Sequence, residues 1–324
     1  MTRIPLLSVT SLLMICCSAA GIPGYAQHFM QIPGSLTQIA VGRAEVWGLN
    51  GSNIYRFNAG QQKFNQITGS LAQIAVGGGS LLQQDEVWGV NAAGQVFQYN
   101  LNLNEFDFVP GTSLNQIAVG EGDMDNCHPY EVWGIGSGGS LWRYNRCKSE
   151  FQRYDLAAYN SVAVGRNDIW GIRQDGTVIH FSPGVDGEEA VYSQNLQQIA
   201  SGINDIWAID KEGGIHRYDG NTGAFDSPSF CDCIAGQVAA GGDGVWMASL
   251  NKQGPRTISV SQFAYSSTSG YDESGFFNPV FSMLAGVSSV QQLAVGSGGG
   301  VWLITSTEGF KFQKSYQVYT WVRP

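Results

Sequence analysis

The chain contains little charge. Of its 324 residues, 17 are Lys or Arg and 26 are Asp or Glu, so 13% are charged, against about 25% in an average soluble domain. With 43% apolar residues, this composition excludes a disordered chain and disfavours a coiled coil or helical bundle. No block of consecutive Lys or Arg occurs and the formal net charge is −9. Nucleic acid and anionic lipid surfaces are therefore not expected as partners.

Several functional signatures are also missing. The chain has only four histidines and no Gly-x-Ser-x-Gly motif or glycine-rich phosphate loop, so we expect no enzymatic activity and no cofactor. No segment after the N-terminal region reaches the roughly 18 consecutive apolar residues of a membrane-spanning helix. We therefore expect no membrane span.

The first 26 residues have the pattern of a secretory signal peptide. Arg3 precedes an apolar run over residues 4–17, and Gly24, Tyr25 and Ala26 form a plausible cleavage site. We expect residues 27–324 to form one domain that is secreted, either to the extracellular space or to the periplasm.

Four cysteines remain after the signal peptide, namely Cys127, Cys147, Cys231 and Cys233. An even number in an oxidising compartment indicates disulfides. Of the three possible pairings, Cys127 with Cys147 and Cys231 with Cys233 is favoured, because each pair then falls within one of the repeats described below. The spacing of these cysteines is unlike that of a zinc site, so no metal is expected.

A short phrase, Gln-Ile-Ala-Val-Gly or a variant of it, recurs through the chain. It occupies residues 38–42, 73–77, 116–120, 161–165, 198–202, 237–241 and 292–296. A second phrase follows each copy and contains a tryptophan: Trp47, Trp88, Trp133, Trp170, Trp207, Trp246 and Trp302. In the first five copies an acidic residue stands two places before the tryptophan. Repetition of this kind predicts a repeat architecture.

Two further phrases complete each repeat. The third alternates aromatic and polar residues, as in residues 54–57 and 96–99, and the fourth begins with an aromatic residue, as in 64–67 and 106–109. Turn sequences such as Asn50-Gly51 lie between the phrases. Each repeat is therefore predicted to be a four-stranded antiparallel meander.

The fold predicted from these repeats is an all-β propeller. The tryptophans are 41, 45, 37, 37, 39 and 56 residues apart, close to the roughly 40 to 50 residues of one propeller blade. Seven blades are favoured and six are the alternative. The last spacing predicts an insertion at about residues 251–281. Residues 29–34 and 319–322 both match a fourth strand, so either the last blade has five strands or one terminus lies outside the sheet.

The three phrases Gln-Ile-Ala-Val-Gly, acidic-Val-Trp-Gly and Gly-x-Ile-Tyr-Arg-Phe resemble the tectonin repeat. The resemblance covers about residues 28–324 and is strongest in the first five repeats. It implies a β-propeller and, as in the secreted members of the family, binding to lipopolysaccharide or other surface glycans. The last two repeats depart from the pattern, because the acid is shifted by one place before Trp246 and is absent before Trp302.

Candidate binding residues come from the repeated positions. Tryptophan rings could stack on sugars, although burial between blades is the favoured role, and carboxylates could accept sugar hydroxyls or backbone N–H groups of a turn. Arginines in the third phrase could meet anionic groups on a glycan. The carbohydrate-binding candidates are Glu45, Trp47, Glu86, Trp88, Glu131, Trp133, Asp168, Trp170, Asp205 and Trp207, and the secondary candidates are Arg56, Arg143 and Arg217.

Three functions fit this sequence. The leading hypothesis is a multivalent glycan-binding propeller, in which weak sites on one ring gain avidity. The alternatives are a protein-interaction scaffold that uses one propeller face, and a hydrolase whose carboxylates meet at the ring axis.

Overall fold

The computed structural model describes residues 28–78, 84–121, 127–128, 130–165, 168–181, 188–191, 195–202, 205–226, 233–242, 244–251, 258–265, 275–282, 289–308 and 314–322. These residues form 27 β-strands and one short 3-10 helix, η1 (Ser137–Gly139). The signal peptide predicted for residues 1–26 lies outside the described residues.

The strands form four-stranded antiparallel units, which we number in chain order. Unit 1 contains β2 (Gln38–Val41), β3 (Val46–Asn50), β4 (Asn53–Asn58) and β5 (Lys63–Ile67). Unit 2 contains β6 (Gln73–Gly77), β7 (Glu86–Val90), β8 (Gln95–Asn100) and the first half of β9 (Glu105–Glu121). Unit 3 contains the second half of β9, β10 (Tyr130–Gly136), β11 (Leu141–Asn145) and β12 (Glu150–Asp155). Because β9 belongs to both units 2 and 3, their strands are joined in one seven-stranded sheet.

The remaining units follow the same order. Unit 4 contains β13 (Tyr159–Val164), β14 (Ile169–Arg173), β15 (Val178–Phe181) and β16 (Glu188–Val191). Unit 5 contains β17 (Leu196–Ser201), β18 (Ile206–Asp210), β19 (Ile215–Asp219) and β20 (Ala224–Asp226). Unit 6 contains β21 (Cys233–Gly241), β22 (Gly244–Asn251), β23 (Ile258–Tyr265) and β24 (Gly275–Ser282). Unit 7 contains β25 (Ser289–Val295), β26 (Val301–Glu308), β27 (Lys314–Val322) and β1 (His28–Ile32).

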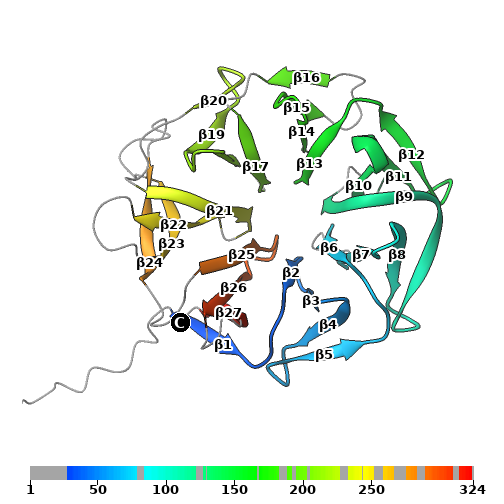
Figure 1. Cartoon of the computed structure of the whole chain (residues 1–324), viewed down its shortest axis with the longest axis horizontal. Helices are drawn as coiled ribbons and strands as arrows, with labels where there is room; N and C mark the ends of the chain where they lie inside the picture. Colours follow the sequence, from blue (N-terminus) through cyan, green and yellow to red (C-terminus); the bar gives the residue numbers. More distant parts are fainter. Residues whose placement is uncertain are drawn as a thin grey trace, which may run out of the picture.

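The units are arranged around a central axis, with the first strand of each unit innermost and the fourth on the outside (Figure 1). The predicted all-β propeller of four-stranded antiparallel blades is therefore confirmed. Among the described strands we find seven such units, and each contains one repeat tryptophan on its second strand.

The ring closes through residues 29–34, whose prediction as a fourth strand is confirmed, but in neither of the two arrangements considered for the last blade. Strand β1 pairs antiparallel with β27, with Ile32 opposite Val318, and is the fourth strand of unit 7. Strand β27 is the third strand, because Trp302 lies opposite Thr320 just as Trp47 lies opposite Arg56 in unit 1. The two alternatives, a fifth strand or an excluded terminus, were both wrong. The hairpin of β26 and β27 is longer than that of β3 and β4. When the residue spacing of unit 1 is applied after Trp302, residues 319–322 are therefore assigned to the fourth strand, although they belong to the third.

The segment predicted as an insertion contains two strands of the sheet. Residues 251–281 include β23 and most of β24, the third and fourth strands of unit 6. Each of these strands has 8 residues, whereas β4 and β5 have 6 and 5. Longer strands therefore account for part of the large spacing between Trp246 and Trp302.

The last two residues of the Gln-Ile-Ala-Val-Gly phrase line the axis. A cavity of about 140 Å³ lies there, surrounded by valines, glycines, alanine and serines from all seven units. Neighbouring units approach so closely here that the last position of the phrase needs glycine. A Cβ on Gly77 would stand 2.4 Å from the carbonyl oxygen of Val119 in the next unit. The described residues around this cavity include no carboxylate, so they supply no acid pair of the kind considered for an axial hydrolase.

Candidate functional site

The repeat tryptophans lie between neighbouring units. Each of the seven is at most 4% exposed. Trp47 packs edge-on against Tyr99 and Phe106 of unit 2, with ring centroids 4.6 and 5.8 Å apart. The same contact closes the ring, where Trp302 meets Phe57 of unit 1 at 4.8 Å. The favoured role as interface packing is confirmed, and the covered rings offer no exposed face on which a sugar could stack.

Three of the acidic residues bind the tryptophan of their own unit. In units 2, 3 and 4 the indole Nε1 of the tryptophan donates to the acid two residues before it, at 2.9 Å for Glu86, 2.6 Å for Glu131 and 2.8 Å for Asp168. Residues two apart along an extended chain point to the same side, which explains this pairing. The alternative role, a carboxylate that accepts backbone N–H groups of the turn, belongs instead to Asp85. It accepts from the nitrogens of residues 43, 44 and 45 at 2.7 to 2.9 Å.

A cationic or polar side chain on the third strand completes each cluster. This residue lies directly opposite the tryptophan in the strand register: Arg56, Gln98, Arg143, His180 and Arg217 in units 1 to 5. Arg56 donates to Glu45 from Nε at 2.8 Å and from its terminal nitrogen at 2.6 Å. Arg217 donates to Asp205 at 2.8 Å, and His180 binds Asp168. We call each set of acid, tryptophan and opposite residue a junction cluster.

The cations also cover the tryptophan rings. The guanidinium carbons of Arg56 and Arg143 stand 5.6 Å from the ring centroids of Trp47 and Trp133. The ring of His180 stacks on Trp170 at 4.3 Å. Hydrogen bonding to Glu45 raises the pKa of Arg56, although partial burial opposes this. Arg56 and Arg143 are thus each held by a carboxylate on one side and by an aromatic ring on the other.

The clusters differ in how far they reach solvent. The side chains of Glu45 and Arg56 are 26% and 29% exposed, and those of Asp168 and His180 are 24% and 18% exposed. In unit 3, Glu131 is fully buried. A partly exposed tyrosine of the following unit borders the clusters of units 1 and 4, with Tyr99 beside Arg56 and Tyr218 beside Trp170. The cluster of unit 1 therefore presents a carboxylate, a guanidinium and an aromatic edge to solvent, and the cluster of unit 4 presents a carboxylate, an imidazole and an aromatic edge.

Unit 2 obtains its cation from the neighbouring unit. Gln98 stands opposite Trp88 and donates to Glu86 at 3.3 Å, and Arg146 of unit 3 forms an ion pair with Glu86. Burial raises the pKa of Glu86, whereas Arg146 and the hydrogen bonds from Trp88 and Gln98 lower it, and the net shift is upward. The sequence analysis did not find Arg146, because it lies outside the repeated phrases.

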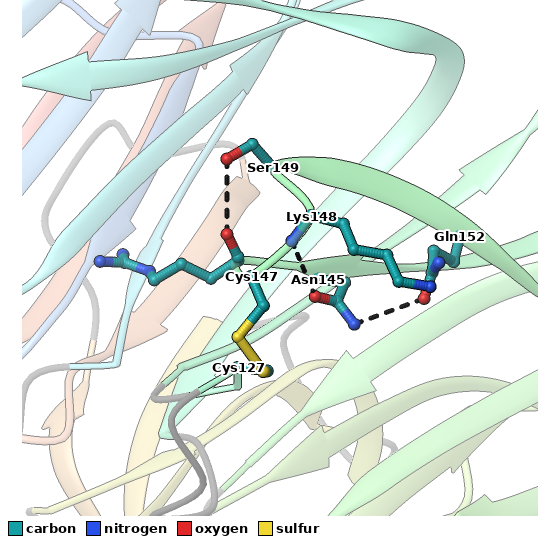
Figure 2. The surroundings of a disulfide bond; sticks show 7 residues. Cys127, Asn145, Cys147, Lys148, Ser149 and Gln152 are labelled. Atoms are coloured by element: carbon teal, nitrogen blue, oxygen red, sulfur yellow. Dashed lines mark hydrogen bonds between the residues drawn. A yellow bond between two sulfur atoms is a disulfide. The ribbon is translucent and has the colours of Figure 1, made fainter.

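A disulfide positions this arginine. Cys127 and Cys147 are bonded, with their Cα atoms 5.0 Å apart, which confirms the favoured pairing. The backbone nitrogen of Arg146, the residue before Cys147, donates to the carbonyl of Cys127 at 3.0 Å. Figure 2 shows the adjoining turn, in which the Lys148 nitrogen donates to the side chain of Asn145 at 3.1 Å. Cys233 is also disulfide-bonded, but Cys231, its expected partner, lies outside the described residues.

The glutamine of the first phrase has a role that the sequence analysis missed. Gln38 accepts from the backbone nitrogen of Ile74 at 3.0 Å and donates to the carbonyl of the same residue at 3.4 Å. Gln73, Gln198 and Gln292 form the equivalent pair of bonds to Ile117, Val238 and Ile39 in the units that follow them. We call this pair of bonds the glutamine clamp. Its regular recurrence at the first position of the phrase was the signal that could have revealed it.

Within the residues that the structure describes, no group of three or more His, Cys, Asp or Glu side chains could hold a metal ion. The same residues contain no helix of the length and hydrophobicity that crossing a bilayer requires.

The fold and the junction clusters define a β-propeller assembled from tryptophan repeats. The chain belongs to the tectonin-domain family, because the model of the tectonin domain matches residues 17–185, which is more than half of the chain. No curated protein matches the chain.

Several solved structures share the fold. Prp20p from Saccharomyces cerevisiae, studied for its binding to Gsp1p and histones, has a TM-score of 0.60 and 10% identity, covering 89% of this chain and 82% of its own. Human WBSCR16 has a TM-score of 0.58 and 10% identity, with 91% and 88% covered. YCF48 bound to D1 peptide has a TM-score of 0.59 and 12% identity, with 92% and 96% covered. At these identities the similarity concerns the fold alone.

Proposed function

We propose that this protein is a secreted, multivalent carbohydrate-binding propeller, and that its sites are the junction clusters. The observation that carries the proposal is the recurrence of a partly exposed carboxylate paired with an arginine or a histidine at the border of two units, in units 1, 4 and 5. Membership in the tectonin-domain family supports it.

The chemistry of the clusters suits sugar hydroxyls. A carboxylate has about four acceptor positions, so Glu45 and Asp168 retain acceptors after binding their cations. The remaining N–H groups of Arg56 can donate to sugar oxygens. The aromatic edges of Tyr99 and Tyr218 supply apolar surface for the C–H face of a sugar.

The charge of the clusters favours neutral glycans. In the clusters of units 1 and 5 the charge of the carboxylate is matched by an arginine of the same unit. Without residues 1–26, the chain has a net charge of −10, since only Arg3 is lost. We therefore expect hydroxyl-rich surface glycans to bind better than the phosphate groups of lipopolysaccharide.

Secretion is part of the proposal. The pattern of residues 1–26 indicates export, and the Cys127–Cys147 disulfide is typical of proteins from oxidising compartments. Weak sites spaced around one rigid ring would gain avidity on a dense glycan surface without any deep pocket.

A glycan array tests the proposal. The variant Glu45→Gln/Asp168→Asn removes the two most exposed carboxylates of the clusters, and we expect its apparent affinity for a bound glycan to fall at least about tenfold. The control is Glu212→Gln, which removes one charge from an exposed residue on the 2–3 connection of unit 5, on the opposite ring face. Circular dichroism of each variant verifies the fold. Binding that survives the double substitution, or a wild type that binds no glycan, would overturn the proposal.

A further inference from the structure

A second candidate site lies on the other face of the ring, between units 3 and 4. A cavity of about 530 Å³ opens there beside the turn after β10 and the start of β13. Its lining includes Gly136, Gly138 and Gly139 of the turn, and Gln116, Asn160 and Gln174 nearby. The junction clusters lie at the opposite ends of the same strands, because Glu131 begins β10 and Ile135 is near its end.

The lining of this cavity is rich in amides. Five of its residues are Asn or Gln, namely Gln73, Asn115, Gln116, Asn160 and Gln174, and no charged residue is among the described residues that line it. Gln73 uses a donor and its acceptor in the glutamine clamp, and each of the other four amides has two donors and one carbonyl acceptor. The cavity therefore presents many donors and acceptors and no net charge.

One of these amides has an unused acceptor. The Oε1 atom of Gln116 is buried and has no hydrogen-bond partner, whereas Gln38, Gln73, Gln198 and Gln292 use theirs in the glutamine clamp. Gln116 stands at the same place in the phrase as these clamp residues. A buried acceptor without a partner is energetically unfavourable. A ligand that donates a hydrogen bond to this oxygen would remove that cost.

A rigid tyrosine borders the cavity. Tyr159 is only 2% exposed and donates its hydroxyl hydrogen to Asp155 at 2.6 Å. Arg173 donates to Asp155 at 3.1 Å. Burial alone would raise the pKa of Asp155, but the hydrogen bonds from Tyr159, the Ala157 nitrogen and Arg173 outweigh it and hold the pKa at about 2. The ring of Tyr159 is covered, so it offers no stacking platform for a sugar.

We propose that this cavity binds an extended, uncharged segment of polypeptide through its main-chain amides. A main chain alternates N–H donors and C=O acceptors, which Asn and Gln side chains complement at both ends. The described residues that line the cavity provide neither the charge that a phosphate requires nor the open aromatic face that favours a sugar. Gly138 has φ +76° and nothing within 4 Å of the place a Cβ would occupy, so a ligand backbone can approach closely. The protein would then hold a peptide on one face and glycans on the other.

Nuclear magnetic resonance of the ¹⁵N-labelled protein tests this proposal with two probes. Acetyl-tetraalanine-amide should shift the side-chain NH₂ signals of Gln116, Asn160 and Gln174 in a saturable manner. Methyl glucoside should leave these signals in place. The proposal is wrong if the peptide causes no saturable shift, or if the sugar alone causes it.

Two matched variants test the role of the unused acceptor. Gln116→Met removes it while keeping the length of the side chain, and we expect about tenfold weaker peptide binding with an unchanged or higher melting temperature. Gln198→Met removes a working clamp far from the cavity and should lower the melting temperature without changing peptide binding. Peptide binding that is unaffected by Gln116→Met would refute the assignment. Glycan-array binding of the Gln116→Met variant should equal that of the wild type, which separates this site from the junction clusters.

Discussion

At the scale of single residues, the structure explains why an acid, a tryptophan and a cation recur together. The acid stands on the same side as the tryptophan ring, and the cation lies opposite the tryptophan on the next strand. Glu131 in unit 3 is fully buried and binds both Trp133 Nε1 and Arg143, whereas Glu45 in unit 1 is 26% exposed. The same cluster therefore contributes to stability in one unit and remains available to ligands in another.

This difference predicts unequal costs of substitution. Glu131→Ala leaves the guanidinium of Arg143 without its carboxylate in a buried setting, and we expect the free energy of unfolding to fall by about 3 kcal/mol. Glu45→Ala breaks a partly exposed pair and should cost about 1 kcal/mol. Urea unfolding followed by tryptophan fluorescence measures both. Equal losses in the two variants would contradict the distinction.

At the scale of elements, neighbouring units are joined by side chains as well as by packing. The glutamine clamp lets one side chain bind both backbone groups of a residue on the first strand of the next unit. Unit 4 lacks the glutamine itself, because Ser161 occupies this position and is too short to form the clamp with unit 5. Gln116 occupies the glutamine position of unit 3, but its Oε1 atom has no hydrogen-bond partner. Both borders of unit 4 therefore lack the full clamp.

Restoring the clamp should stabilise the ring. In Ser161→Gln the new side chain would reach the backbone of Ile199, as Gln198 reaches Val238. We expect the free energy of unfolding to increase by about 1 kcal/mol, the net contribution of a well-formed hydrogen bond. Differential scanning calorimetry of the variant tests this, with Ser161→Ala as the control. A melting temperature no higher than that of Ser161→Ala would show that the clamp does not form there.

At the scale of the whole molecule, strand β1 closes the ring by joining the N-terminal part of the chain to the C-terminal strands. Phe29 on β1 is 7% exposed and packs against Trp321 at 5.0 Å and Trp246 at 6.1 Å. Residues nearly 300 positions apart along the chain thus form one sheet. The stability of unit 7 therefore depends on β1, a strand from the N-terminal part of the chain, whereas its other three strands come from the C-terminal part.

Truncating this contact should weaken the closure of the ring. Phe29→Ala removes an aromatic side chain from the packing between units 6 and 7, and we expect a loss of about 3 kcal/mol. Limited proteolysis should detect earlier cleavage in units 6 and 7 than in units 2 and 3. Gln31→Ala, at an exposed position of the same strand, is the control. Uniform cleavage around the ring in Phe29→Ala would show that the closure is not a local weak point.

Much of this arrangement could be predicted from the sequence. Recurrence of the four phrases predicted the four-stranded units, the propeller and the burial of Trp47 and its equivalents, because the period of the repeats and the alternation of apolar residues reflect local geometry. The pairing of Cys127 with Cys147 followed from their position within one repeat.

Other features were decided only by the tertiary structure. The order of strands in unit 7, the ion pair of Arg146 with Glu86 and the unused acceptor of Gln116 all depend on which neighbour a side chain meets. The sequence by itself determined the repeating unit, because hydrogen bonding and apolar spacing within a meander are local. Only the closed ring determined which carboxylates are buried, which remain in solvent and where the cavity between units 3 and 4 opens, because these depend on contacts between units far apart in the chain.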